Sequence, residues 1–217
     1  MVSSRVLSST SELWAQGDVG MLEQPAVGIC GSRDASEAGI RYAMEFGRIA
    51  AEAGFAVVTG YARGVDSAAH LGALEAGGRT IAVLPEGIQH FHLRKELKTL
   101  ATVDNLLAVS GFRPDAPWTT WNAMNRNKLI VALSSALFVI EAGEKGGTLD
   151  AGLECLRQKK PLYVLEYRDG ASQPTGNHIL LSKKGVAIRT RRELKDFLNR
   201  LMTGSSTESE QKSLEFA

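Results

Sequence analysis

Glycine and a cation occur together in three short segments of the chain: 31-GSRDAS-36, 60-GYARGVD-66 and 141-EAGEKGGTLDAG-152. The cations are Arg33, Arg63 and Lys145. Each segment lies between an apolar run and a helical pattern. Glycine lets backbone N–H groups approach a ligand closely, and the helix that follows directs its positive end to the same point. An arginine adds a planar fork that suits phosphate oxygens. The spacing therefore predicts a binding rim for a phosphate-type anion.

A second polar cluster lies in the segment 118-WTTWNAMNRNKLIVALSS-135. Two asparagines alternate there with Arg126 and Lys128. Because asparagine is a poor helix former, this mixture indicates contacts beyond those of a solvated helix face. The helical spacing places Trp121 and Met124 on the buried face of this predicted helix. Aromatic side chains could also stack on bases, and the candidates are Tyr61, Phe91, Phe112 and Trp118.

Asp66 and His70 are four residues apart in a predicted helix, so they share one helix face. The carboxylate could orient the imidazole and form an acid–base pair with it. No nucleophile or metal candidate accompanies the pair, however. Asp66 also lies near the helix start, where it could cap free N–H groups or hold Arg63. We therefore interpret both residues as structural support.

The signatures of several common enzyme sites are missing from the sequence. There is no GxxxxGK[ST] phosphate loop, no GxGxxG followed by an acidic residue and no G-x-S-x-G nucleophile turn. No cluster of His, Cys and carboxylate residues has metal-ligand spacing, so neither a metal nor another cofactor is predicted. Cys30 and Cys155 lie in apolar contexts, which favours burial over a disulfide.

The composition is ordinary for a globular protein, with 217 residues, 44% hydrophobic and 23% charged. No apolar window is long enough to span a membrane, and the first residues lack the apolar core of a signal peptide. We therefore expect a cytoplasmic protein without a membrane partner. The net charge is only +1, so an anionic partner must be attracted by local clusters of charge.

Short apolar runs alternate with helical patterns along the chain. The predicted strands are 26–30, 55–59, 80–84, 106–109, 136–140, 161–165 and 186–188, and the predicted helices are 36–54, 66–76, 121–133, 148–158 and 192–202. Most strands are apolar on both faces, as a covered parallel sheet requires. The alternation predicts an α/β fold with a doubly wound, mostly parallel sheet in three α/β/α layers. We assign this domain to residues 24–202, after a helical or irregular lead-in over 1–23 and before a disordered tail over 203–217.

The chain resembles the DNA-processing protein A (DprA, also called Smf) family over about residues 18–198. The resemblance is carried by 28-GICGSR-33, 59-TGYARGVDSAAH-70, 126-RNKLIVALS-134 and 141-EAGEKGGTLDAG-152. It implies an extended Rossmann-like fold that binds single-stranded DNA at the carboxyl ends of its strands, without catalysis. It also implies DNA processing during natural transformation and recombination, loading of the RecA recombinase, and a homodimer.

The resemblance also implies which residues bind the phosphate backbone. With Lys145 added from the third loop, they are Gly31, Ser32, Arg33, Thr59, Gly60, Arg63, Arg126, Asn127, Lys128, Gly146, Gly147 and Thr148. The chain departs from the family pattern at Lys128, where a second arginine is usual, and at Gly147, which replaces a common serine. The segment His90–His92 stands where an aromatic residue and a proline usually follow the third strand. We expect a member that consists of the core domain alone.

Two other functions remain open from the sequence. The first is a nucleotide-binding sensor or a phosphoribohydrolase-like enzyme, because 146-GGTLD-150 resembles part of the P-G-G-x-G-T-x-x-E loop of such enzymes. Glu141 or Asp150 would then act as the acid or base beside the anion site. The second is a scaffold in a defence or mobile-element system that uses the core domain to bind a partner.

Overall fold

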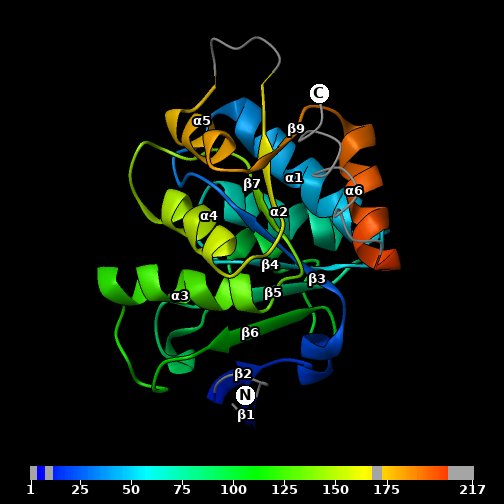
Figure 1. Ribbon diagram of the computed structural model, residues 1–217. Coiled ribbons are helices and arrows are strands. Elements are labelled where there is room, and N and C mark those ends of the chain that lie inside the picture. The colour runs from blue at the N-terminus through cyan, green and yellow to red at the C-terminus, as the bar shows by residue number, and fades with distance from the viewer. Residues whose placement is uncertain (1–3, 8–11, 168–172, 205–217) are drawn as a thin grey trace, which may run out of the picture.

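A single mixed sheet forms the centre of the computed structural model, which describes residues 4–7, 12–167 and 173–204 (Figure 1). In these residues the sheet has nine strands in the order β1-β2-β6-β5-β4-β3-β7-β8-β9. The strands are β1 (Ser4–Leu7), β2 (Glu12–Gln16), β3 (Ala26–Cys30), β4 (Ala56–Thr59), β5 (Thr80–Val83), β6 (Leu106–Ser110), β7 (Leu137–Val139), β8 (Leu162–Leu165) and β9 (Val186–Ile188). All neighbours from β6 to β9 are parallel, whereas β1 pairs with β2, and β2 with β6, in antiparallel fashion.

Helices cover both faces of the sheet. They are α1 (Glu37–Glu52), α2 (Val65–Glu75), α3 (Thr120–Ala132), α4 (Gly147–Arg157), α5 (Thr175–Ser182) and α6 (Arg191–Thr203), with short 3₁₀ turns η1 (Val19–Glu23), η2 (Ile88–His90) and η3 (Lys95–Leu97). One apolar core joins α1, α2 and α6 to the sheet, and a second joins α3, α4 and α5 to the opposite face. This is the predicted three-layer, doubly wound α/β fold, which is confirmed (Figure 1).

Burial on both faces explains why the strands could be recognised in the sequence. All five residues of β3, an interior strand of the sheet, are apolar and buried. The seven predicted strands and five predicted helices coincide with β3 to β9 and with α1, α2, α3, α4 and α6, to within two residues at each end. Cys30 and Cys155 are buried free thiols, as expected, and burial raises the pKa of both.

Two glycines allow α1 and α2 to pack closely against each other. A β-carbon on Gly47 would lie 2.3 Å from the carbonyl oxygen of Ala69, and one on Gly72 would lie 1.9 Å from that of Met44. A larger residue at either position would therefore force the helices apart. Helix α2 follows the β4–α2 turn, which carries the second glycine–cation pair.

The beginning of the chain differs from its prediction. Residues 1–23 were expected to be helical or irregular, and this is wrong for β1 and β2, which extend the sheet beyond β6. In β2, Leu13 and Ala15 are completely buried, while Glu12, Trp14 and Gln16 are more exposed. This alternation extends over only five residues, so it is a weak signal of a strand. The pairing of Trp14 with Ser110 joins residues that are distant in the sequence, so no local pattern indicates it.

Two further expectations concern the second half of the chain. Helix α5 was not predicted, because its eight residues provide only about two turns of helical pattern. Helix α6 continues to Thr203 and ends at Gly204 in a left-handed conformation. The remainder of the expected disordered tail, residues 205–217, lies outside the described residues. Within the part of the chain that the structure describes, no helix is both long and apolar enough to cross a membrane.

Candidate functional site

The carboxyl ends of the central strands form the edge at which doubly wound sheets bind ligands. The chain leaves β3, adds β4, β5 and β6 on one side, and then returns to place β7 on the other side of β3. The loops after these strands consequently meet near the carboxyl end of β3. This reversal brings together the glycine–cation segments that are far apart in the sequence.

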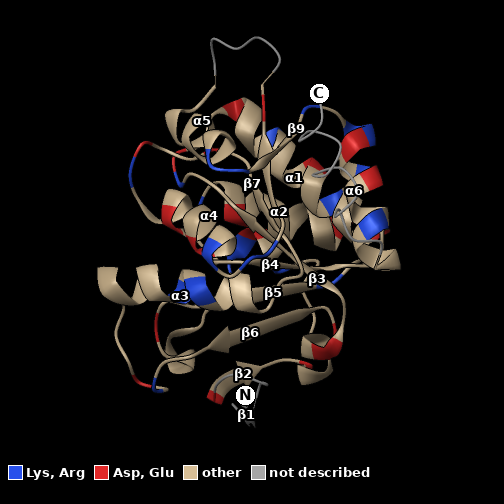
Figure 2. Cartoon of the chain, viewed as in Figure 1, with Lys and Arg blue, Asp and Glu red and all other residues tan. Residues whose placement is uncertain are grey.

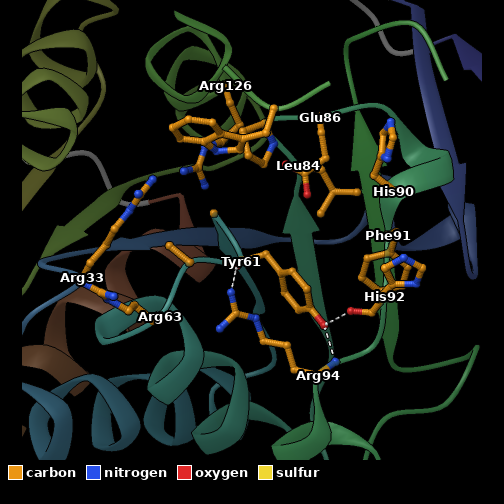
Figure 3. A pocket seen from close by; sticks show the side chains of 14 residues that line it. Arg33, Tyr61, Arg63, Leu84, Glu86, His90, Phe91, His92, Arg94 and Arg126 are labelled. Carbon is orange, nitrogen blue, oxygen red and sulfur yellow. Dashed lines mark hydrogen bonds between the residues drawn. The ribbon is translucent and has the colours of Figure 1, made fainter. Parts of the chain in front are cut away.

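Two adjoining cavities occupy this edge, and we call them the anion cavity and the aromatic cavity. The anion cavity, of about 480 Å³, is lined by residues that include Gly31, Ser32, Arg33, Lys145, Gly147 and Thr148. The aromatic cavity, of about 620 Å³, is lined by residues that include Tyr61, Glu86, His90, Phe91, His92 and Arg94. Arg33, Ala62, Trp118 and Arg126 line both cavities and form the wall between them. Figure 3 shows Arg33, Arg63 and Arg126 on one side of the aromatic cavity and Phe91, His90 and His92 on the other.

Arg126 is the buried cation of the shared wall. Its side chain comes from α3 and is only 6% exposed, with Nη1 3.9 Å from Oδ2 of Asp66 and 3.4 Å from the carbonyl oxygen of Val83. Its Nε is buried and has no hydrogen-bond partner in the described residues. Gly60 makes room for the guanidinium, since a β-carbon there would lie 1.2 Å from Nη1. Arg126 therefore retains an unsatisfied donor at the junction of the two cavities.

Asp66 is the counterion of Arg126. The sequence suggested that Asp66 could hold Arg63, but it does not. Its Oδ2 accepts a hydrogen bond from the Ala62 N–H at 3.2 Å. Burial raises the pKa of the Asp66 carboxyl, and the nearby guanidinium and backbone donors oppose that rise. Arg63 instead forms an exposed ion pair with Asp34 at 2.7 Å.

The imidazole of His70 forms its hydrogen bond with Thr80 and not with Asp66. Its Nδ1 lies 2.6 Å from Oγ1 of Thr80, and that hydroxyl donates its only proton to the carbonyl oxygen of Val57. Nδ1 must therefore be the donor, and Nε2 is left buried without a partner. Burial, assisted by Arg94 and Arg126, lowers the pKa of His70 to about 3. The imidazole is thus neutral and does not form the acid–base pair considered from the sequence.

The start of α4 forms the far wall of the anion cavity. The side chain of Thr148 donates to the carbonyl oxygen of Gly31 at 3.0 Å, and Nδ2 of Asn127 donates to the carbonyl oxygen of Gly147 at 2.8 Å. These bonds fix the helix start against β3 and α3. The first N–H groups of a helix lack partners within it, so α4 presents donors and a positive dipole end at this wall.

Arg33 and Lys145 supply positive charge to the anion cavity. Both line the anion cavity, and neither side chain forms a hydrogen bond or ion pair with another described residue. Figure 2 shows that, across the molecule as a whole, basic and acidic residues are interspersed. The positive character of the site is therefore local, as the net charge of +1 requires.

Three of the predicted site residues lie elsewhere. Lys128 lines neither cavity, and its Nζ contacts Oδ1 of Asn125 on the exposed side of α3. Successive helical residues differ by roughly 100°, so the side chains at positions 126, 127 and 128 cannot all face one site. Thr59 is completely buried below the site, where its Oγ1 accepts the Gly60 N–H at 2.7 Å. Gly146 precedes α4 with φ 111° and lines neither cavity.

The exposed apolar side chains at the start of α3 contradict another expectation. Trp121 and Met124 were assigned to the buried face, but they are 68% and 49% exposed. Ile130, two turns further on, is buried. The first turns of α3 extend beyond the sheet, so the apolar pattern there does not pack on the core. Trp118 is 50% exposed and lines both cavities.

Several residues of the aromatic cavity were not assigned to the site from the sequence. They are Glu86, His90, His92 and Arg94. The 3₁₀ turn η2 and the loops on either side of it carry these residues to the cavity, and none of these segments has a periodic pattern. Only the departure from the family pattern at His90–His92 marked the segment as unusual.

The two carboxylates considered for hydrolysis do not line these cavities. The oxygens of Glu141 accept hydrogen bonds from the backbone and side chain of Ser36 and from the hydroxyl of Tyr167. Glu141 therefore secures the start of α1 to β7 and β8. Asp150 also lines neither cavity. In the described residues, no group of three or more His, Cys, Asp or Glu side chains could hold a metal ion.

Comparison with known proteins identifies the family. The model of the family described as DNA recombination-mediator protein A matches residues 4–201. The chain belongs to this family. Protein Smf of Escherichia coli (strain K12) is 29% identical over 184 residues, which cover 84% of this chain and 49% of that protein. The chain spans about half the length of the first curated relatives that it matches.

Solved structures of the family have the same fold. DNA processing protein A of Helicobacter pylori superposes with a TM-score of 0.79 at 24% identity, over 93% of this chain and 96% of that chain. The protein of Streptococcus pneumoniae superposes with a TM-score of 0.74 at 26% identity, over 87% of this chain and 67% of that chain. The family match begins at residue 4, so it includes β1 and β2, which the resemblance from about residue 18 did not cover.

Proposed function

We propose that this chain binds single-stranded DNA, without catalysing a reaction on it, by seating a backbone phosphate in the anion cavity. One observation carries this proposal: separate elements direct uncompensated positive groups into one cavity. These groups are the side chains of Arg33 and Lys145 and the N-terminal amides of α4, and the buried guanidinium of Arg126 lies beside them with Asp66 as its counterion. A phosphate has enough acceptor oxygens to bind several of these donors at once.

The recessed position of Arg126 favours a single strand over a duplex. A flexible single strand can turn one phosphate towards a recessed donor while its unpaired bases contact aromatic side chains nearby. Tyr61, Phe91 and Trp118 line the adjoining cavity within the same edge of the sheet. The related protein of Helicobacter pylori is described by its single-stranded DNA binding mode, which supports the same ligand for this chain.

A titration of labelled oligonucleotides at several salt concentrations tests this function. We expect the logarithm of the affinity to fall linearly with the logarithm of the salt concentration, with a slope of about −0.7 for each phosphate neutralised. Arg33→Ala should weaken binding and make this slope shallower. Lys128→Ala removes the same charge from a residue outside both cavities, so it should change neither quantity appreciably. Binding that ignores salt, or equal losses in the two variants, would refute the assignment of the anion cavity.

We further propose that the chain acts in DNA uptake and recombination, as a homodimer that helps to load RecA on single strands. The family's description as recombination mediators supports this role. Sedimentation of the free protein would test the dimer. A RecA filament assay on strands coated with this chain would test loading, and no gain in filament formation would argue against that part of the proposal.

A further inference from the structure

A third cavity lies at the ends of β8 and β9, and we call it the arginine groove. Its volume is about 1080 Å³, and it shares no described lining residue with the anion cavity or the aromatic cavity. Its walls come from α1, from the segments that follow β8 and β9 and from the start of α6, all of which lie near one another in Figure 1. The function proposed above uses none of these residues.

The floor of the arginine groove is apolar. Met44 and Phe46 of α1 form it together with Leu165, Ile188 and Leu194 from β8, β9 and α6. All of these except Met44 are buried in the core on this face of the sheet, which fixes their positions. An occupant that lays a large apolar side chain on this floor removes apolar surface from water.

Tyr42 forms an exposed aromatic wall beside this floor. Its side chain lines the groove and is 42% exposed. The ring of Tyr42 meets that of Tyr167 edge-on, with the ring centres 5.6 Å apart. Tyr167 is fixed in turn, because its hydroxyl donates to Oε1 of Glu141 at 2.6 Å. The wall is therefore preformed, and tyrosine is a residue type enriched where proteins contact one another.

The rim of the groove is basic. Two glutamates, Glu45 and Glu75, line it against five arginines, which are Arg41, Arg48, Arg189, Arg191 and Arg192. The positive end of the α6 dipole lies at the same rim, since this helix begins at Arg191. The whole chain carries a net charge of only +1, so this surplus of cations is a local feature.

Three of these arginines are poorly neutralised. Arg41 forms no hydrogen bond or ion pair with another described residue. Arg192 is 92% exposed, and its ion-pair partner Asp196 is 3.9 Å away. Arg191 is 75% exposed and shares the Oε1 atom of Glu45 with Arg48, at 2.9 and 2.7 Å.

The other two arginines are paired more fully. Arg48 also contacts Glu52, and Arg189 pairs with Glu166 at 2.5 Å. The rim thus contains both structural ion pairs and cations that remain available to a ligand.

From these observations we propose that the arginine groove docks an acidic peptide segment of a partner protein, with large apolar side chains on the floor and carboxylates at the rim. In an extended peptide, side chains alternate between two faces, so a segment of alternating acidic and apolar residues matches both surfaces. A nucleic-acid backbone could pair with the rim, but it carries no apolar group for a mostly aliphatic floor. The proposal does not depend on DNA binding at the anion cavity.

Fluorescence anisotropy with the full chain and a labelled synthetic peptide, Glu-Glu-Leu-Glu-Phe-Glu-Glu, tests the docking. We expect binding that weakens as the salt concentration rises, because exposed charges are screened. A second peptide, with Ser in place of Leu and Phe, has the same charge and should bind at least about tenfold more weakly, since it leaves the floor uncovered. Equal binding of the two peptides, or no binding of the first, would overturn the proposal.

Variants of the chain locate the bound peptide. Arg41→Ala and Arg192→Ala should each weaken peptide binding by about threefold, as expected for the loss of one exposed charge pair. Arg157→Ala is the matched control, because Arg157 is 67% exposed on α4, which covers the opposite face of the sheet. It should leave peptide binding unchanged. Equal losses in all three variants would show that the peptide binds without using the groove.

Two further measurements separate other occupants of the groove. In Arg33→Ala, whose anion cavity is weakened, oligo-dT should fail to displace the peptide. Displacement there would assign the groove to nucleic acid and overturn the proposal. Sedimentation of Arg41→Ala should match that of the unaltered chain. A change in self-association would instead identify the groove as a contact between copies of this chain.

Discussion

The ion pair between Arg126 and Asp66 combines a requirement of folding with one of binding. Both side chains are less than a tenth exposed, and their charged atoms are 3.9 Å apart. Removing water from two charges is costly, and their mutual attraction recovers only part of that cost. The arrangement therefore adds little stability, but it holds a cation with a free donor between the two cavities.

Asp66→Asn should be strongly destabilising, because it leaves a buried guanidinium without its counterion. The expected loss in the free energy of unfolding is about 3–5 kcal/mol, measured by urea denaturation. The double variant Asp66→Leu with Arg126→Met should recover much of that loss but should not recover DNA binding. Equal destabilisation by the single and double variants would show that the pair is not coupled as described.

The neutral state of His70 makes the stability of the protein depend on pH. The pKa of this side chain falls from 6.5 to about 3 on folding, so only the unfolded chain takes up a proton here as the pH drops below about 6.5. The contribution of neutral His70 to the free energy of unfolding is therefore fully present above pH 6.5. It declines towards pH 3, by up to about 1.4 kcal/mol per pH unit.

Denaturation at pH values between 6.5 and 5 should reveal this decline, before most carboxylates begin to titrate. His70→Asn can still donate to Thr80 but cannot become protonated, so its stability should vary less with pH over the same range. An unchanged slope in the variant would mean that another group takes up the proton.

At the scale of elements, the end of α3 is held by one lysine from another segment. Nζ of Lys160, which precedes β8, donates to the carbonyl oxygens of Val131, Ala132 and Ser134 at 2.7–2.8 Å. The last carbonyls of a helix lack partners within it, and a cation there also interacts favourably with the helix dipole. Lys160 thereby fixes the position of the helix that carries Arg126 and Asn127.

Lys160→Met should lower the free energy of unfolding by about 1–3 kcal/mol, because the helix end loses three charge-assisted hydrogen bonds. The adjacent exposed Lys159 forms no such bonds, so Lys159→Met is the matched control and should have little effect. Thermal or urea denaturation of the two variants gives the comparison. Similar losses in both would exclude a specific role for the Lys160 hydrogen bonds.

Helical geometry also explains which predicted site residues come together. The three consecutive residues 126–128 were assigned to one basic wall, but only two of them face the anion cavity. Arg126 and Asn127 both line it, Asn127 also fixes α4, and the helical rotation turns Lys128 away from the site. A motif written as a line of letters does not contain this rotation, which follows only from the helical conformation.

At the scale of the whole molecule, the site depends on the reversal of strand order at β3. The reversal brings loops from β3, β4, β5 and β7 to one point, with α3 and α4 beside it. Because the net charge is only +1 and exposed charges are screened over about 8 Å at physiological salt, the DNA binding proposed above would depend on these few clustered cations.

The sequence by itself determined the α/β class, the positions of most elements and the glycine–cation loops at their ends. These features depend on local patterns, such as buried apolar runs, helical spacing and turn residues, and each can be recognised without knowledge of distant contacts. The same local patterns predicted an anion site that includes Gly31, Arg33 and Lys145, and these three residues line one cavity.

Only the tertiary structure decided what the turn 57-VVTGYARGVDSAAH-70 does within that site. Its Gly60 makes room for Arg126, its Asp66 balances that charge, its His70 is bonded to Thr80, and its Tyr61 lines a second cavity. The antiparallel addition of β2 and the placement of Glu86 were decided in the same way. Each depends on contacts between residues distant in sequence, whose geometry exists only once the sheet has formed and its two faces are covered.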